Sequence, residues 1–158
     1  MLEIRAMRLE DQDAAVRIIK AHHEVDGKLA GEYYEEYFAD PVRVNSAREA
    51  NYVGLEGDVV VGVTGHYPDK YDWPTILWLN WHYVHPEYRR RGIGAKLLAY
   101  VVDLAKKHGI RKLYQDTSSD ASYAAAVRLY GKFGFQEEGR LLDYYGDGEH
   151  YLIMGSEL

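Results

Sequence analysis

The sequence predicts a mixed α/β (α+β) fold, in which a single, mostly antiparallel sheet of about seven strands is flanked by about four helices. Turn signals at residues 56–58 and 146–148 each separate two strand patterns, which indicates two antiparallel hairpins. Two strand–helix–strand passes lie between them, around helices expected after Gly92 and Ser122. Hairpins combined with such passes predict a mixed sheet with helices on its faces.

The first third of the chain is expected to form a strand, two helices and a hairpin. Residues 2–8 have a strand pattern, and residues 11–25 repeat apolar side chains at helical spacing. A second helix is expected over residues 32–38, and it ends before a proline because proline disfavours helix in its predecessor. Residues 52–55 and 59–67 are expected to be the strands of the first hairpin.

The rest of the chain begins with a loop over residues 68–74, which starts and ends with proline. Residues 75–85, rich in aromatic and β-branched side chains, are expected to form one continuous fourth strand. The remaining expected elements are a helix that starts near Ile93 and stops at Gly109, a strand over 112–117, a helix over 122–133, and hairpin strands over 135–145 and 149–158.

Length and composition exclude several classes of protein. A chain of 158 residues predicts one domain, spanning residues 1–158, with a sizeable core. It has no run of ~20 apolar residues and no secretory segment, so a cytoplasmic protein without membrane contact is expected. The absence of cysteine excludes disulfides and thiolate ligands, and no metal is expected. A net charge of −6 disfavours nucleic acid as a partner.

The most informative stretch is Arg-Arg-Arg-Gly-Ile-Gly-Ala-Lys at residues 89–96, here called the glycine loop. Unpaired amides and the dipole at the expected helix start favour an anion, and Gly92 and Gly94 allow a phosphate close to the backbone. The glycine spacing fits neither a nucleotide-triphosphatase loop nor a dinucleotide fingerprint. A ligand with phosphates is therefore expected; a solvated basic loop is the alternative.

Two further blocks give the glycine loop a family context. Tyr-Val-His-Pro-Glu-Tyr precedes it at residues 83–88, and Leu-Tyr-Gly-Lys-Phe-Gly-Phe follows at residues 129–135. Their order and separation resemble the GNAT superfamily of acetyl-CoA-dependent N-acetyltransferases, over essentially the whole chain. The resemblance implies a GNAT fold with a splayed parallel pair of fourth and fifth strands, which admits acetyl-CoA. The implied coenzyme-binding residues are Val84, Arg89, Arg90, Arg91, Gly92, Ile93, Gly94, Ala95 and Lys96.

Acetyl transfer to an amine needs hydrogen-bond donors for the thioester oxygen and for the departing sulfur. The resemblance implies a backbone amide near Val84 as the first donor and Tyr130 as the second. A phenol with a pKa of ~10 keeps its proton at neutral pH, which suits a general acid. The alternative is that Tyr130 only packs its helix against the sheet.

The amine must also lose a proton, and the sequence offers more than one candidate for the group that accepts it. The glutamate that some relatives carry on the fourth strand is absent here. His82 titrates near neutrality and is a candidate base, directly or through a water held with Asn80 and Asp116. The alternatives are a histidine satisfied on the sheet face and an aspartate that serves as a cap or turn acid. Tyr123 stands where many relatives carry an asparagine.

Acidic and aromatic side chains are expected to surround the acceptor. Such a rim suits a cationic amine through charge attraction and cation–π contact. The expected acceptor is a peptide or protein amine, or a small cationic amine. A catalytically silent module that binds acetyl-CoA stays open as the alternative, as does a homodimer through the exposed edge of the last hairpin. The rim residues are Glu24, Tyr33, Tyr34, Tyr144 and Tyr145.

Overall fold

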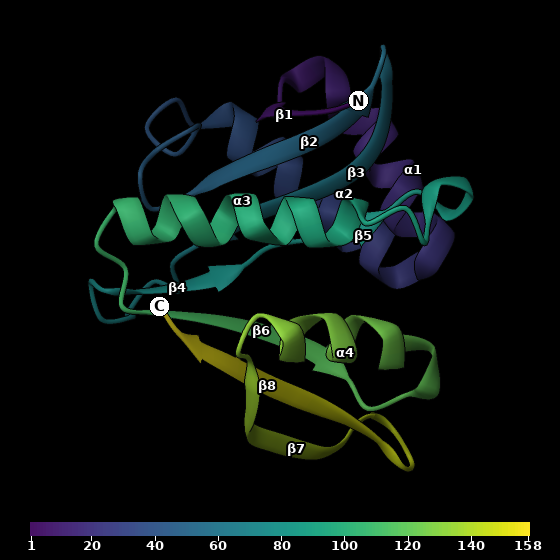
Figure 1. Cartoon of the computed structure of the whole chain (residues 1–158), viewed down its shortest axis with the longest axis vertical. Coiled ribbons are helices and arrows are strands. Elements are labelled where there is room, and N and C mark those ends of the chain that lie inside the picture. The colour runs from purple at the N-terminus through teal and green to yellow at the C-terminus, as the bar shows by residue number, and fades with distance from the viewer. The chain divides into compact units, whose positions relative to one another are not determined.

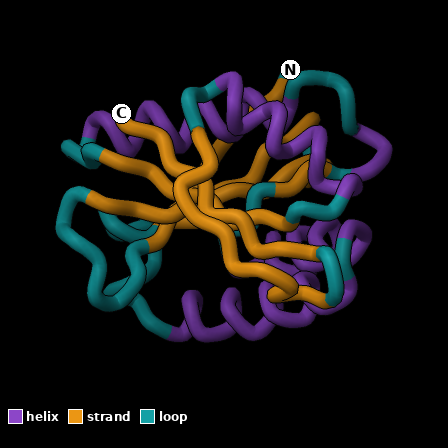
Figure 2. Tube along the Cα trace, turned by 90° about the horizontal axis from the view of Figure 1, so that it is seen from below, coloured by secondary structure: helices purple, strands orange, loops and turns teal.

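The computed structural model describes all 158 residues and divides them into two compact units. Unit 1 comprises Met1–Tyr67 and Asn80–Asp103, and unit 2 comprises Pro68–Leu79 and Leu104–Leu158. Helix α3 (Ile93–Lys107) passes from the first unit into the second. A strand lies next to each end of the chain (Figure 2). The expectation of one domain over residues 1–158 stays a prediction.

Unit 1 is built on an antiparallel sheet with the strand order β1-β2-β3, and β5 pairs with β3 (Figure 1). Its strands are β1 (Leu2–Ala6), β2 (Ala50–Glu56), β3 (Val59–Tyr67) and β5 (Tyr83–Val84). Its helices, besides most of α3, are η1 (Leu9–Asp11), α1 (Gln12–His22), α2 (Glu24–Ala39) and η2 (Pro86–Tyr88).

Two apolar clusters fix the helices of unit 1. Ile18 and Ile19 of α1 share one cluster with Tyr34 of α2 and with Val53 and Val63 of the sheet. The amphipathic spacing of the apolar residues places them on the face of each helix that packs. The buried residues of this cluster are Met7, Ala15, Ile18, Ile19, Ala30, Tyr34, Val53, Leu55 and Val63.

The second cluster joins the first half of α3 to β3, through Ile93, Leu97 and Val61. The helix comes very close to the strand at Gly62, where an added Cβ atom would lie 2.7 Å from Leu97 Cδ1. A side chain at Gly62 would therefore push α3 away from β3.

Unit 2 contains a four-stranded sheet in the order β4-β6-β8-β7. The strands β4 and β6 are parallel, with pairs from Ile76↔Lys112 to Trp78↔Tyr114, and the other neighbours are antiparallel. This confirms the parallel pair that the resemblance implied. The elements are β4 (Ile76–Leu79), β6 (Lys112–Ser118), η3 (Ala121–Tyr123), α4 (Ala124–Lys132), β7 (Gln136–Gly146) and β8 (Glu149–Glu157).

The mixed α/β, mostly antiparallel fold is confirmed, but the fourth strand is not continuous. The structure has eight strands rather than about seven because residues 75–85 form β4 and β5 with a break between them. Trp81 in the break has a φ of 39°, in the left-handed region, and Asn80 N donates to Gly65 O at 2.8 Å. The β-branched and aromatic composition predicted an unbroken strand and contained no signal for this break.

The boundary between the first two helices also differs from the prediction. The first helix ends at His22 and the second begins at Glu24, well before residue 32. His23 caps the second helix, since its Nδ1 accepts from Asp26 N at 3.2 Å. Gly27 weakens the helical pattern but is needed, because a Cβ there would lie 2.6 Å from Lys20 Cβ. None of the helices has the length and apolar character that crossing a membrane requires.

Candidate functional site

The backbone of the glycine loop leaves the start of α3 open. Gly92 has a φ of 75°, and an added Cβ there would have no atom within 4 Å. Lys96 N donates to Gly92 O at 3.1 Å in the first turn of α3. The amides of Ile93, Gly94 and Ala95, which precede that bond, have no acceptor within the helix. These amides and the positive end of the helix dipole favour an anion at this position.

The four cations of the glycine loop differ in what they already contact. Arg90 and Lys96 are exposed, and neither side chain makes a hydrogen bond or an ion pair. Arg91 lies over the ring of Tyr88 at 4.9 Å, and its Nη1 is 3.8 Å from Glu56 Oε2. Arg90 and Lys96 are therefore the charges most available to phosphates.

Arg89 is committed to a contact with α1. Its Nη2 lies 2.8 Å from His22 Nε2, which also lies 3.0 Å from the backbone oxygen of Val84. Depending on its tautomer, His22 Nε2 either accepts from Arg89 or donates to Val84. Burial lowers the pKa of His22, and the Arg89 charge lowers it further, while the contact with Val84 acts in the opposite direction. The contact links the glycine loop to the end of α1.

His82, the candidate base, lies beneath the same loop. Its Nδ1 is 3.0 Å from Thr64 Oγ1 of β3, and the ring also contacts the backbone of Gly94. Burial lowers its pKa to about 4, although the contact with Gly94 acts in the opposite direction. The ring is therefore neutral at pH 7, and it connects β3 to the start of α3.

Tyr130 in unit 2 lies in a buried polar setting, here called the Tyr130 cluster, with Gln115, Asp116 and Phe135. Tyr130 is 2% exposed on α4, and its ring centroid lies 5.7 Å from that of Phe135. Its hydroxyl oxygen accepts from Gln115 Nε2 at 3.2 Å. Burial and then the negative charge of Asp116 raise the pKa of the phenol well above its usual value. The hydroxyl group therefore holds its proton firmly.

The structure separates the roles of two aspartates near the end of β6. Asp120, and not Asp116, caps the short helix η3, because its side chain accepts from Ser122 N at 3.0 Å. Asp116 is half-buried on β6 and acts electrostatically on Tyr130. Sequence reasoning missed Gln115, for which the strand pattern offers no signal beyond a polar residue at a buried position.

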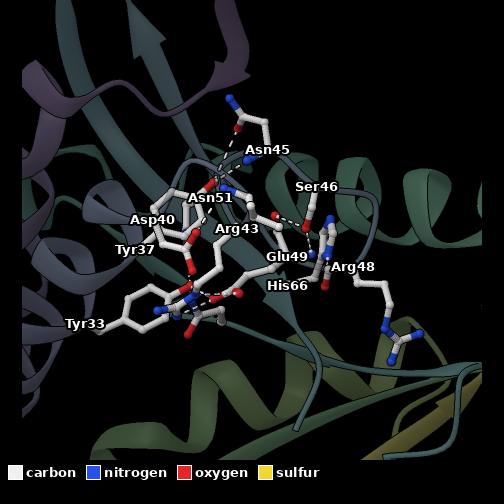
Figure 3. A network of polar contacts seen from close by, with 12 residues as sticks. Tyr33, Tyr37, Asp40, Arg43, Asn45, Ser46, Arg48, Glu49, Asn51 and His66 are labelled. Atoms are coloured by element: carbon white, nitrogen blue, oxygen red, sulfur yellow. Dashed lines mark hydrogen bonds and ion pairs between the residues drawn. The ribbon is translucent and has the colours of Figure 1, made fainter. Parts of the chain in front are cut away.

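The expected rim residues lie in different environments. Glu24 of unit 1 is exposed and pairs with Lys20 at 3.0 Å. The prediction that Tyr34 lines a rim is wrong, because its side chain is fully buried in the core of unit 1. Tyr33 is half-buried, and its hydroxyl joins the polar network of Figure 3.

The other two rim residues, Tyr144 and Tyr145, lie on β7 in unit 2. They are 59% and 46% exposed. Their rings lie 4.9 Å apart, and Tyr151 of β8 packs beside both. They form an exposed aromatic surface on the last hairpin.

Comparison with known proteins places these features in a family. The model of the acetyltransferase (GNAT) family matches residues 12–135. A ribosomal protein bS18-alanine N-acetyltransferase of Escherichia coli is 39% identical over 73 residues, which cover 45% of this chain and 48% of the relative. The chain thus spans about half the length of this relative.

Two further proteins are similar over more of their length. A spermine/spermidine N(1)-acetyltransferase of Bacillus subtilis is 33% identical over 115 residues, covering 67% of this chain and 74% of the relative. The crystal structure of an acetyltransferase described as a GNAT protein, from Desulfovibrio desulfuricans, superposes with a TM-score of 0.86 at 24% identity, and the match covers 99% of both chains.

Proposed function

The chain belongs to the GNAT family of acetyltransferases, and on this premise we propose that it transfers an acetyl group from acetyl-CoA to a primary amine. The observation that carries the proposal is the buried, firmly protonated hydroxyl of Tyr130 at the motif position of the family's general acid. A module that only binds the coenzyme has no need of such a group.

The glycine loop suits the coenzyme. The open amides of Ile93, Gly94 and Ala95 would hold a pyrophosphate, and Arg90 and Lys96 would add charge. Gly92 leaves open space beside the backbone, so a phosphate meets no side chain there. Arg89 and Arg91 would contribute after leaving their present contacts with His22 and Glu56. Val84 would supply the backbone amide for the thioester oxygen.

When bound, acetyl-CoA supplies an acetyl group activated as a thioester: the C–N bond forms with the amine and the C–S bond breaks. Tyr130 Oη would donate a hydrogen bond to the departing sulfur and stabilise the negative charge that develops on it, while the raised pKa keeps the proton on the phenol. Its oxygen already accepts from Gln115 Nε2, and this contact orients the hydroxyl group. Asp116 keeps the phenol protonated by raising its pKa.

The amine has to lose a proton, and His82 is a weak base for this step. With its pKa lowered to about 4, the imidazole is neutral at pH 7 and holds a proton only briefly. We assign it the role of a hydrogen-bond acceptor in a water path to solvent, with Asp116 as the second candidate. The amine itself would then set most of the pH dependence.

The acceptor class is drawn from the chemistry of the relatives and of the exposed surface. The Escherichia coli relative acts on an alanine of a ribosomal protein, and the Bacillus subtilis relative acts on spermine and spermidine. A primary amine of a peptide or of a small polyamine is therefore proposed. We place the peptide amine first, because Tyr144 and Tyr145 offer an exposed aromatic surface on the last hairpin.

The test is acetyl-CoA turnover, followed as free thiol release between pH 6 and 9. The acceptors are spermidine, small monoamines, and a short peptide with an N-terminal alanine. Turnover with an amine supports the transferase and identifies its acceptor class. Tight binding of acetyl-CoA without acetylation of any amine in the panel or of a protein extract would favour the silent module.

A further inference from the structure

Buried and half-buried polar side chains of unit 1 form a hydrogen-bonded chain that has no role in the acetyl transfer described above. We call Asn80, Asn51, Tyr33 and Glu49 the amide relay. Asn80 Nδ2 donates to Asn51 Oδ1, Asn51 Nδ2 donates to Tyr33 Oη, and Tyr33 Oη donates to Glu49 Oε1. Each of these three hydrogen bonds is 3.0 Å long. Figure 3 shows Tyr33, Glu49 and Asn51 in this network, together with Arg43.

The carboxylate at one end fixes the direction of the whole relay. Arg43 donates to both oxygens of Glu49, at 3.0 and 2.8 Å, and its guanidinium lies 5.8 Å from the centre of the Tyr33 ring. A carboxylate only accepts hydrogen bonds, so the hydroxyl of Tyr33 has to donate to it. The Tyr33 oxygen is then left to accept.

The donor–acceptor direction at Tyr33 also fixes the orientations of the Asn51 and Asn80 amide groups, because only one orientation of each gives a donor facing an acceptor. Asn51 has to present its NH₂ group to Tyr33, so its carbonyl oxygen faces Asn80. Asn80 in turn has to present its NH₂ group to Asn51. A flipped amide at either position would set two acceptors or two donors against each other. The orientation of Asn80 is therefore determined by Glu49, through two intervening side chains.

The consequence is a polar atom without a partner. Asn80 is 6% exposed and Asn51 is fully buried, yet no hydrogen bond within the chain reaches Asn80 Oδ1. The oxygen is not among the buried side-chain atoms that lack a partner, so it is open to solvent, and a ligand N–H group can take the place of water there. An amide that donates through its nitrogen also becomes a stronger acceptor at its oxygen, so the relay prepares this atom for an N–H group.

The position of Asn80 along the chain suits contact with a substrate. It lies at the break between β4 and β5, where Trp81 has a left-handed backbone. The chain then continues through Val84 and η2 into the glycine loop. Such breaks next to a site redirect side chains toward a ligand.

We propose that Asn80 Oδ1 holds the amine substrate by accepting one of its N–H hydrogens. Asn51 and Tyr33 are positioning residues that keep this oxygen, rather than the NH₂ group, turned toward the amine. One N–H is held while the nitrogen lone pair stays available for attack. The inference rests on the proposed function, because it names the atom that recognises the acceptor.

The experiment compares Asn80→Ala and Tyr33→Phe with the wild type and with Asn45→Ala. The control removes a polar side chain that contacts Tyr37 Oη nearby, at 3.4 Å, without touching the relay. The amine KM and acetyl-CoA KM are measured with spermidine and with the alanine-first peptide. Amine binding is also measured by calorimetry in the presence of free coenzyme A, and thermal unfolding reports whether each variant folds.

Asn80→Ala is expected to raise the amine KM and the amine Kd about tenfold, with the acetyl-CoA KM unchanged. Tyr33→Phe removes the group that fixes both amides, so each can flip and only part of the molecules keep Asn80 Oδ1 facing the amine. The amine KM and the amine Kd should therefore rise about threefold. Asn45→Ala should change neither. An unchanged amine Kd in a folded Asn80→Ala protein, or a fall in kcat alone, would overturn the inference. Failure of the wild type to acetylate any amine would instead remove the proposed function.

Discussion

The glycine loop of unit 1 and the Tyr130 cluster of unit 2 differ in how they prepare for the same proposed reaction. The loop presents several exposed cations and open backbone amides. The cluster buries one hydroxyl group, which a hydrogen bond from Gln115 positions beside the charge of Asp116. Exposed, redundant contacts are screened by solvent, whereas a buried and positioned group acts alone. Substitutions in the two regions should therefore have very different effects.

The largest effect is expected from Tyr130→Phe. Loss of the hydroxyl removes the hydrogen-bond donor for the departing sulfur, and loss of one such donor costs roughly 100-fold or more in rate. We expect kcat to fall about 100-fold while the Kd of acetyl-CoA, measured by calorimetry, stays within about twofold. Tyr151→Phe serves as the matched control in the same unit. An equal loss of coenzyme affinity in the Tyr130 variant would contradict the assignment.

The next effect concerns the backbone of the loop and not its charges. Gly92→Val forces a β-branched residue to a φ of 75° and should raise the acetyl-CoA KM about tenfold, because the helix start shifts to relieve the strain. The control is Gly57→Val, since Gly57 has a φ of 60° and equally open space in the β2–β3 turn. Both variants should lose a similar amount of thermal stability. An increase in KM for both would show that strain, and not the loop, is the cause.

A smaller effect is expected from single cations of the loop. Arg90→Ala should raise the acetyl-CoA KM about fivefold at low salt, since exposed charge pairs contribute up to about 1 kcal/mol. Arg91→Ala should change it less, because Arg91 already contacts Tyr88 and Glu56. Kinetics at two salt concentrations test this, and the difference should shrink as salt rises. A larger effect for Arg91 than for Arg90 would reverse this ranking.

The smallest effect is a pH dependence of folding that originates beneath the loop. Because the pKa of His82 is lowered from 6.5 to about 4, the unfolded chain binds more protons than the folded chain between these values. The free energy of unfolding should therefore fall as pH drops through this window. Urea unfolding at pH 7 and pH 5 measures the fall, and His82→Gln should reduce it. An equal fall in the variant would assign the effect to other groups.

Sequence reasoning recovered the elements whose signal is local. The hairpins and the start of α3 follow from periodicity, turn residues and the two glycines, whereas the parallel pair was implied only by the family resemblance. The break at Trp81 was missed because the composition of residues 75–85 is that of an ordinary strand. The early start of α2 was missed because Gly27, which lowers helix propensity, is required by close packing against Lys20.

The candidate site also contains residues with a local sequence signal and residues without one. Motif positions predict roles for Tyr130 and the glycine loop, because those residues stand in a conspicuous pattern, and these roles stay predictions. The amide relay joins α2, β2 and the break after β4, which are far apart in the chain, and polar residues at such positions carry no periodic signature. Tyr34 was assigned to the rim because it is interleaved with acidic residues in a segment expected to flank the acceptor, and only its packing shows that it belongs to the core.

The close contact at Gly62 has a practical consequence for experiments that use heat to detect ligands. Because Gly62 has no side chain, Leu97 packs directly against β3 and holds α3 close to the sheet. The same contact therefore contributes to thermal stability and to the position of the helix end that would receive phosphate. Gly62→Ala should lower thermal stability and coenzyme affinity together. A thermal-shift screen of variants near this contact would therefore mistake a folding defect for a binding defect, unless affinity is measured isothermally.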